Sequence, residues 1–248
     1  MDLLIIAAGN SKRMGSLPKT VSLVNGKPNL YNTVEKAKPY FDNIYIFSNL
    51  ENKPLFKEVI YPFRKKCDVI HIESGKGCGD AVLQALEKLG GENYKGKSVI
   101  CWGDVYFETD DIFKEIQDNQ HLNTPVLIPV RYEDDPYVWF YLKEDGISVI
   151  SSNFKKRGEV SPTGHHDQSI FMIDNVGLYN ALLSIKDVLY KNGTYLHGEM
   201  IFLDAVNYLN NTNNNAIIYE TKYPTRGYNT QSELEDINNF YKNVKNNS

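Results

Sequence analysis

The chain has 248 residues, of which 42% are hydrophobic and 23% charged, and its formal net charge is −4 at neutral pH. This composition is typical of a folded globular protein and is far from that of a disordered chain. The negative balance argues against a general nucleic-acid binder, which would carry a basic surplus. No apolar run approaches the ~18 residues of a membrane span. The chain starts directly with a strand pattern, so we expect no signal peptide and no membrane partner.

The cysteines and histidines show no metal or disulfide pattern. Cys67, Cys78 and Cys101 are odd in number and lack C-x-x-C spacing, which excludes a disulfide framework and an obvious zinc site. Free cysteines fit a reducing cytoplasm, where we expect the protein to reside. The histidines form no H-E-x-x-H pattern, and the sequence assigns no role to His165, His166 or His197.

The chain opens with an apolar run over 3–8, which predicts a strand buried on both faces of a parallel sheet. A loop over 9–19 follows, with two glycines and the basic residues Lys12, Arg13 and Lys19. Glycines let backbone N–H groups approach a ligand closely, and such groups form an anion-binding nest. Ligands of open α/β sheets bind at the carboxyl ends of the strands. The stretch therefore predicts a polyphosphate cradle; a charged surface loop is the alternative.

The same stretch resembles the signature of the sugar-phosphate nucleotidyltransferase family, which reads L-A-A-G, a few small or polar residues, R-M-G and then P-K. The matching residues are Gly9, Arg13, Met14, Gly15, Pro18 and Lys19. The family's loop is usually richer in glycine than Asn10-Ser11-Lys12. No Gly-Lys-Ser/Thr follows, so this is not a Walker A loop. The resemblance implies that the nucleotide is held by Ala7, Ala8, Gly9, Asn10, Ser11, Arg13 and Lys19.

Strand and helix patterns alternate through the first hundred residues. After a Gly-containing turn at 25–28, a helix is predicted from about 29 to 38, a strand at 44–48, a loop or short helix at 54–66, a strand at 68–73, a helix after Gly79 and a strand at 98–102. This alternation predicts βαβ units and a parallel sheet with right-handed crossovers.

The second half mixes strands, a hairpin and helices. Strands are predicted at 126–130, 169–173 and 216–220, a hairpin at 137–142 with 147–150, a loop at 163–167, and helices at about 176–190, 199–209 and 231–244. No internal repeat or long linker is present. We expect a single domain over 1–248, an α/β Rossmann-like mixed, mostly parallel sheet flanked by helices. The resemblance implies a nucleotide-binding half over about 1–125 and an acceptor-binding half over about 126–248.

Asp104 is the strongest candidate acid. It follows the strand at 98–102 directly after Gly103, which places its carboxylate at the sheet edge close to the first loop. A carboxylate beside a polyphosphate requires a cation between them, and Mg²⁺ is the usual one. The corresponding G-D motif of the family binds Mg²⁺ through its Asp. A cap of the following segment is the alternative role.

Asn229 is the candidate for a second metal ligand. Gly227-Tyr228-Asn229 resembles the late family segment that supplies this ligand, in the G-V-N-N form of the acetylglucosamine-phosphate uridylyltransferases. Asn can ligate through its carbonyl oxygen. Thr230 and Glu233 also predict a capping box at the start of the last helix, and both roles can hold together.

Further candidates for ligand binding come from the resemblance. Gly77, Gly79 and Asp80 lie in a segment like the family's base-reading loop, although a plain turn before a helix is the alternative. Lys155 or Lys156 lies where the family's E-K-P motif places a lysine for the acceptor phosphate, with a solvated basic turn as the alternative. Glu199 falls in a segment like G-E-Y-Y-L-T-D, where the Glu helps to read the acceptor; otherwise it is an acid at a helix start.

Together these features predict transfer of a nucleotidyl group from an NTP to a phosphorylated small acceptor, with release of pyrophosphate. Arg13, Lys19 and Asp104 are the residues expected to take part in the chemistry, with Asp104 and Asn229 placing Mg²⁺. Over its whole length the chain is most similar to the cytidylyltransferases of capsular phosphoramidate biosynthesis, which join CTP to L-glutamine phosphate. Sugar-1-phosphate or choline-phosphate acceptors are the alternatives within the family.

Two other classes remain open. A glycosyltransferase would carry Asp-x-Asp after the fourth strand, where this chain has one Asp after Trp102-Gly103. A non-catalytic nucleotide sensor would keep the loop and could lose the metal ligands, both of which are present here. The sequence does not indicate the oligomeric state.

Overall fold

The computed structural model describes residues 1–9, 17–73, 75–155, 158–191, 194–195, 198–212 and 215–246. Its centre is one sheet with the strand order β11-β8-β12-β6-β1-β4-β5, and β15 pairs with β8. The strands are β1 (Asp2–Ile6), β4 (Ile44–Ser48), β5 (Cys67–His71), β6 (Lys97–Trp102), β8 (Val126–Asp134), β11 (Thr163–Asp167), β12 (Ile170–Asp174) and β15 (Ile217–Glu220). β5, β4, β1 and β6 are parallel, and β12 runs antiparallel to both of its neighbours.

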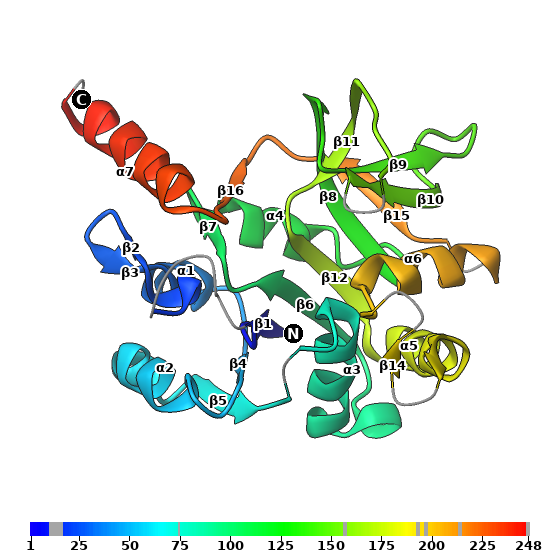
Figure 1. Ribbon diagram of the computed structural model, residues 1–248, viewed down its shortest axis with the longest axis horizontal. Coiled ribbons are helices and arrows are strands. Elements are labelled where there is room, and N and C mark those ends of the chain that lie inside the picture. Colours follow the sequence, from blue (N-terminus) through cyan, green and yellow to red (C-terminus); the bar gives the residue numbers. More distant parts are fainter. Residues whose placement is uncertain are drawn as a thin grey trace.

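Helices cover both faces of this sheet (Figure 1). They are α1 (Asn29–Ala37), α2 (Lys53–Val59), α3 (Cys78–Leu89), α4 (Asp111–Asp118), α5 (Asn175–Leu189) and α6 (Phe202–Asn211), whereas α7 (Gln231–Asn246) packs on a separate small cluster with Tyr106 and Tyr228. The apolar faces of α1, α2 and α4 share one core with one face of the sheet, and those of α3, α5 and α6 share a second core with the other. The predicted single-domain α/β fold with a mixed, mostly parallel sheet is confirmed.

β1 shows why the opening run is apolar throughout. Successive strand side chains point to opposite faces, and Leu3 and Ile5 enter one core while Leu4 and Ile6 enter the other. All four are buried. The prediction of a strand buried on both faces is therefore correct.

Small pairs of strands complete the fold. They are β2 (Leu23–Val24) with β3 (Lys27–Pro28), β7 (Val105–Phe107) with β16 (Thr225–Gly227), β9 (Val138–Leu142) with β10 (Val149–Phe154), and β13 (Tyr190–Lys191) with β14 (Thr194–Tyr195). The β9–β10 pair is the predicted hairpin. Short 3-10 segments lie at Lys19–Val21, Tyr61–Phe63 and Gly91–Asn93.

The strand order defines where a ligand can bind. From β1 the chain moves outward to β4 and β5, and then returns to place β6 on the other side of β1. In open α/β sheets a crevice forms at this reversal, outside the carboxyl ends of the two strands. Ala7-Ala8-Gly9 follows β1 and Gly103-Asp104 follows β6, so both predicted motifs lie at the reversal.

Two predictions of local structure were wrong. Residues 163–167, predicted as a loop, form β11, which pairs with the distal half of β8. The helix predicted from Glu199 begins only at Phe202, because the backbone of Met200 bonds to the segment before α3. Met200 N–H donates to Lys76 O at 2.9 Å, and Met200 O accepts from Gly79 N–H at 2.9 Å.

Cys67, Cys78 and Cys101 are free, as predicted, and Cys101 lies in the core. Within the described ranges, no helix combines the length and the apolar character needed to cross a membrane.

Candidate active site

The site is organised by the short ladder between β7 and β16. β7 begins directly after Asp104, and β16 ends two residues before Asn229. Across the antiparallel ladder Gly227 is opposite Val105, Arg226 is opposite Tyr106 and Thr225 is opposite Phe107. The pairing therefore brings together two predicted metal ligands that lie 125 residues apart in the numbering (229 − 104).

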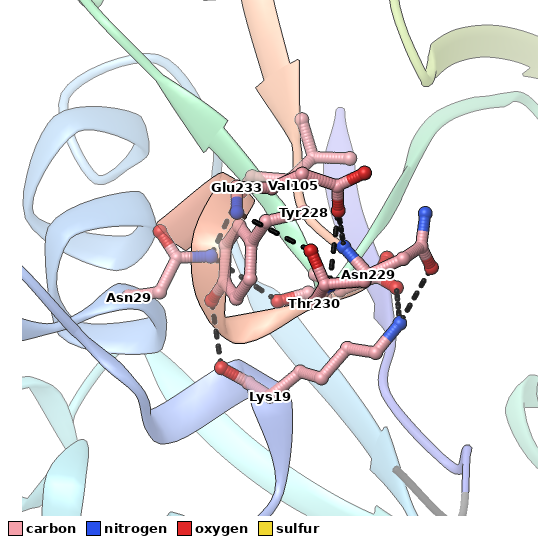
Figure 2. Close-up of polar contacts among 9 residues, drawn as sticks. Lys19, Asn29, Val105, Tyr228, Asn229, Thr230 and Glu233 are labelled. Carbon is pink, nitrogen blue, oxygen red and sulfur yellow. Dashed lines mark hydrogen bonds and ion pairs between the residues drawn. The ribbon is translucent and has the colours of Figure 1, made fainter. Parts of the chain in front are cut away.

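Lys19 connects the two. Its ammonium Nζ lies 3.2 Å from Asp104 Oδ2 and 2.7 Å from Asn229 Oδ1, and Figure 2 shows the contact with Asn229. The Lys19 side chain is only 12% exposed, against 40% for Asp104. Three residues predicted from separate motifs thus meet at one point, where the Lys19 ammonium lies between the carboxylate of Asp104 and the amide oxygen of Asn229.

Two buried side chains that sequence reasoning missed hold this point in place. The Tyr228 hydroxyl donates to Lys19 O at 2.7 Å, and Asn29 Nδ2 donates to Val105 O at 2.9 Å and to Gly103 O at 3.3 Å (Figure 2). Burial, with the nearby charge of Asp104, raises the pKa of Tyr228, so the phenol stays a donor. Asn29 begins α1 after a proline, which reads as an ordinary helix start. The only signal for Tyr228 was its place beside Asn229.

The predicted capping box at the start of α7 is confirmed. Glu233 N–H donates to Thr230 Oγ1 at 3.3 Å, and Thr230 N–H donates to Glu233 Oε2 at 2.9 Å. Asn229 N–H also donates to Glu233 Oε2. These backbone donors lower the pKa of Glu233. The cap therefore fixes the backbone of Asn229 while its side chain turns to Lys19, so the two predicted roles of this segment coexist.

The donor set at this point fits the predicted Mg²⁺. One carboxylate and one amide carbonyl converge on the same ammonium ion, and hard oxygen ligands of this kind, few in number, are what Mg²⁺ takes when phosphate oxygens complete its shell. Within the described ranges no group of three or more His, Cys, Asp or Glu side chains could hold a metal by itself. Asp104 and Asn229 would thus supply a partial shell that a bound triphosphate completes.

Gly103 lets β6 approach the end of β1. Its N–H donates to Ile6 O at 2.9 Å, and a Cβ at this position would lie 2.8 Å from Ala7 Cβ and 3.0 Å from Thr20 Oγ1. The close packing of this position on Ala7 and Thr20 therefore explains why the first residue of the G-D motif is glycine.

Gly103→Ala is expected to reduce the free energy of unfolding by about 1–3 kcal/mol, the usual cost of overpacking a tight site. Urea denaturation measures the change. Gly227→Ala is the control, because a Cβ there would meet nothing within 4 Å and should not destabilise the fold. Equal stability of Gly103→Ala and wild type would show that the strand ends can separate freely.

The loop predicted to hold the nucleotide is described only at its edges. Ala7 and Ala8 are buried at the end of β1, and Gly9 is exposed. Asn10, Ser11 and Arg13 lie outside the described residues, so their roles remain predictions.

The predicted base-reading segment packs tightly on the chain before α6. A Cβ on Gly77 would lie 2.1 Å from Met200 O, and one on Gly79 would lie 2.8 Å from Ile201 C. Gly77 also has φ +101°, which favours glycine. Asp80 is buried in the first turn of α3, where it accepts from Gln84 Nε2 at 2.6 Å. The glycines thus have a packing role, and a contact with the base stays a prediction.

Of the predicted acceptor residues, the structure describes Lys155 and Glu199. Lys155 follows β10 and pairs with Asp135, with Nζ 2.6 Å from Oδ1. Glu199 lies in a bend directly before Met200, beside the segment that packs on Gly77 and Gly79. Lys156 and His197 lie outside the described residues.

His165 and His166 lie on β11 and each face an acid. His165 Nε2 is 3.4 Å from Glu220 Oε1, and His166 Nδ1 is 3.0 Å from Glu133 Oε2. Burial opposes the charge of His166, but the hydrogen bond to Glu133 and the charge of Asp167 outweigh it and raise the pKa of His166 above 6.5. The same hydrogen bond lowers the pKa of Glu133 below 4.5.

The ion pair between His166 and Glu133 should therefore be complete between about pH 4.5 and 6.5, and its stabilisation should fade as pH rises through the raised pKa of His166. Glu133→Gln is expected to lower the pKa of His166, measured by NMR titration of its ring, and to destabilise the fold most in that window, by about 1 kcal/mol. Glu220→Gln, beside His165, is the control. An unchanged titration of His166 in Glu133→Gln would contradict the pairing.

Comparison with known proteins identifies a family for this chain. A family model described as the MobA-like NTP transferase domain matches residues 3–164, more than half of the chain. The chain belongs to this nucleotidyltransferase family. The match includes Lys19, Asp104 and the Gly77–Asp80 segment, whereas Glu199 and Asn229 lie beyond it. The predicted resemblance is thus confirmed at the level of NTP transferases.

Curated relatives of this nucleotidyltransferase chain are distant. Over 83% of this chain it is 27% identical to the bifunctional protein GlmU of Methanococcus maripaludis, and over 44% of this chain it is 29% identical to GlmU of Methanocaldococcus jannaschii. It is 34% identical to the 2-C-methyl-D-erythritol 4-phosphate cytidylyltransferase of Bacillus mycoides over 37%. The matches span 46%, 26% and 42% of those proteins, less than half of each.

Solved structures share the fold of this nucleotidyltransferase domain. A structure described as a glucose-1-phosphate thymidylyltransferase from Bacillus anthracis has a TM-score of 0.77 at 17% identity, covering 97% of this chain and 94% of that one. A UDP-glucose pyrophosphorylase complexed with UDP-glucose has a TM-score of 0.75 at 15% identity, with 98% of both chains covered. At these identities the likeness is one of fold.

Proposed function

We propose that this chain is a nucleotidyltransferase that transfers a nucleotidyl group from an NTP to the phosphate of a small acceptor and releases pyrophosphate. The observation that carries the proposal is the convergence of Lys19, Asp104 and Asn229 at the reversal point of the sheet. The family match supports the same reaction class. A lysine that is only 12% exposed and lies between a carboxylate and an amide oxygen suits the binding of a polyphosphate and its cation.

The reaction needs charge neutralisation more than proton transfer. A phosphate monoester has a second pKa of about 6, so the acceptor oxygen is already largely ionised near neutral pH and needs no general base. It attacks the α-phosphorus in line with the leaving pyrophosphate, and catalysis rests on positioning and electrostatics. Lys19, with Arg13, would hold the triphosphate and offset the charge that develops on it.

Asp104 and Asn229 would hold Mg²⁺, which would supply charge neutralisation at the phosphate oxygens. Three features of this chain hold Asp104 and Asn229 in position. The β7–β16 ladder fixes their spacing, the Glu233 cap fixes the Asn229 backbone, and Asn29 anchors the carbonyls on both sides of Asp104.

For the substrates we propose CTP and L-glutamine phosphate, giving CDP-L-glutamine, in capsular phosphoramidate biosynthesis in the cytoplasm. The support is the overall likeness of the chain to cytidylyltransferases of that kind and the 34% identity to a cytidylyltransferase over part of the chain. The acceptor side also departs from the sugar-phosphate pattern, with Phe154-Lys155-Lys156 in place of Glu-Lys-Pro.

A sugar 1-phosphate is the second candidate acceptor. The solved structures with this fold include a thymidylyltransferase described for glucose 1-phosphate and a pyrophosphorylase complexed with UDP-glucose. This alternative keeps the reaction class and changes only the two substrates.

A pyrophosphate-release screen tests the proposal. Each of the common NTPs is combined with L-glutamine phosphate, choline phosphate and glucose 1-phosphate, with and without Mg²⁺. Fastest release with CTP and L-glutamine phosphate is expected. Faster release with UTP or dTTP and glucose 1-phosphate would overturn the substrate assignment, and no release with any pair would overturn the reaction class.

A further inference from the structure

The hairpin β9–β10 carries two buried hydrogen-bond donors that have no acceptor. Trp139 Nε1 and Asn153 Nδ2 are both shielded from solvent and, among the residues that the structure describes, neither finds a partner. Trp139 is only 4% exposed, yet it belongs to none of the apolar clusters that make up the described core. Buried polar groups are nearly always hydrogen-bonded, so each exception points to a missing partner.

The two donors lie side by side. Trp139 and Asn153 are directly opposite each other in the β9–β10 ladder, and opposed residues of an antiparallel pair project from the same face. The other face of the hairpin, with Val138 and Phe140, packs into the core shared with α6. Both donors therefore project from the face that is turned away from α6.

That face meets β11 and β8. A Cβ on Gly164 would lie 2.8 Å from Trp139 Cβ, so the tryptophan lies against β11 where a glycine leaves room for it. Glu133 is opposite Gly164 in the β8–β11 ladder, and His166, two residues on, shares the face of Gly164. The two donor residues thus lie between the β9–β10 hairpin and β11, on the side where β11 carries His166 of the His166–Glu133 ion pair.

The charged side chains near the two donors are already paired with one another. Glu133 is paired with His166, and Asp135 is paired with Lys155, which lies close enough for its charge to act on His166. Neither acid is therefore left for the two donors. An acceptor-only group with several lone pairs, such as a carboxylate or a phosphate, is the chemistry that can pair with two N–H donors from opposed residues.

We propose that Trp139 Nε1 and Asn153 Nδ2, between the β9–β10 hairpin and β11, bind an oxyanion of the acceptor substrate. This assignment rests on the proposed function, because it takes the bound molecule to be the phosphorylated acceptor. The oxyanion is either the phosphate of that molecule or a carboxylate at its other end. The pair would then determine which acceptors the enzyme accepts, without touching the nucleotide.

Binding can be measured without turnover. The chain has two tryptophans, so Trp102→Phe leaves Trp139 as the only one, and Trp102 packs on Phe171 and Phe202, where a phenyl ring is a mild change. Titration with inorganic phosphate and with glutarate distinguishes the two sources of the oxyanion. A saturable change in Trp139 fluorescence with one of them, and none with neutral glucose, is expected.

Variants test the same pair by kinetics. Trp139→Phe, which removes the indole N–H together with part of the ring system, is expected to raise the KM of the acceptor about tenfold, the scale of a lost hydrogen bond to a charged group. Asn153→Asp, which adds a repelling charge, should raise it further, and both should leave the KM of the NTP within threefold. Asn207→Asp is the control on the other face of the hairpin: the carboxylate keeps the two hydrogen bonds that Oδ1 accepts from Ser152 and loses the 3.3 Å bond from Nδ2 to Ser152 O.

The outcomes separate the inference from the function on which it rests. An unchanged acceptor KM in both variants of an active enzyme, or a flat fluorescence titration with both anions, would overturn the oxyanion site and leave the reaction class intact; a trapped water would then satisfy the donors. A fluorescence response in a chain that releases no pyrophosphate would support the site and overturn the proposed function. The fluorescence arm also decides the matter if either variant fails to fold.

Discussion

Asp104→Asn is expected to lower Mg²⁺-dependent turnover by more than about 10²-fold while the fold stays intact. The substitution keeps the shape of the side chain and removes its charge, so Lys19 and the cation lose the carboxylate charge of Asp104 that pairs with the Lys19 ammonium. A loss of this size is typical when one preorganised charge contact is removed from a transition state. Turnover is measured as a function of Mg²⁺ concentration, and circular dichroism melting reports the fold.

Binding of Mn²⁺, followed by electron paramagnetic resonance, gives a second readout that does not depend on turnover, and weaker binding is expected in the variant. Asp236→Asn is the matched control, because Asp236 is exposed on α7. Near wild-type turnover with an unchanged Mg²⁺ dependence would remove Asp104 from the site.

Lys19→Ala is expected to lower kcat/KM by more than about 10²-fold, since it deletes the cation between Asp104 and Asn229. The same loss is expected for Arg13→Ala from the loop motif. Steady-state kinetics with varied NTP measure both. Lys27→Ala is the control: this lysine is half-exposed and pairs with Glu35 at 2.9 Å, and its loss should change kcat/KM by less than threefold.

Effects below threefold for both Lys19→Ala and Arg13→Ala would mean that the first loop is not the triphosphate cradle. A large effect for Lys19→Ala alone would keep the Asp104 centre and remove Arg13 from it.

The sequence predicted the parts of the fold that rest on local patterns. The strand at 44–48 was predicted with its observed bounds, and the capping box of Thr230 and Glu233 is formed as expected. An apolar run and a cap each have a cause within a few residues, namely burial on two faces and orphan N–H groups at a helix start. Such features can be predicted from a single sequence.

Elements that exist only through distant pairing were missed. β16 is Thr225–Gly227, three residues with no apolar alternation, and it forms because β7 offers a partner more than a hundred residues earlier. β11 contains Gly164 and Asp167, residues that are poor in strands, and the free edge of β8 overrides that preference. By contrast, α4 carries buried Ile112, Phe113 and Ile116 at helical spacing. This local pattern predicts a helix, so α4 is missing from the predicted elements for no structural reason.

Sequence motifs predicted the candidate residues, but not the side chains that hold them in place. Motifs indicated Lys19, Asp104 and Asn229, and the structure brings them together. Asn29, Tyr228, Trp139 and Asn153 carry no motif, because their importance comes from what their polar atoms meet, or fail to meet, after folding. Buried polar atoms can be counted only once the packing is known.

The late position of β16 has a consequence for the biosynthesis of the protein. On a ribosome, Asp104 emerges more than a hundred residues before Asn229. A nascent chain that has not reached Thr225 has no β16 to pair with β7, and it lacks the side-chain carbonyl of Asn229 that lies across Lys19 from Asp104. The parallel strands around β1 can meanwhile bury their side chains without it. The proposed active site is thus the last part to be assembled, and incomplete translation products that end before Thr225 should be inert towards cellular nucleotides.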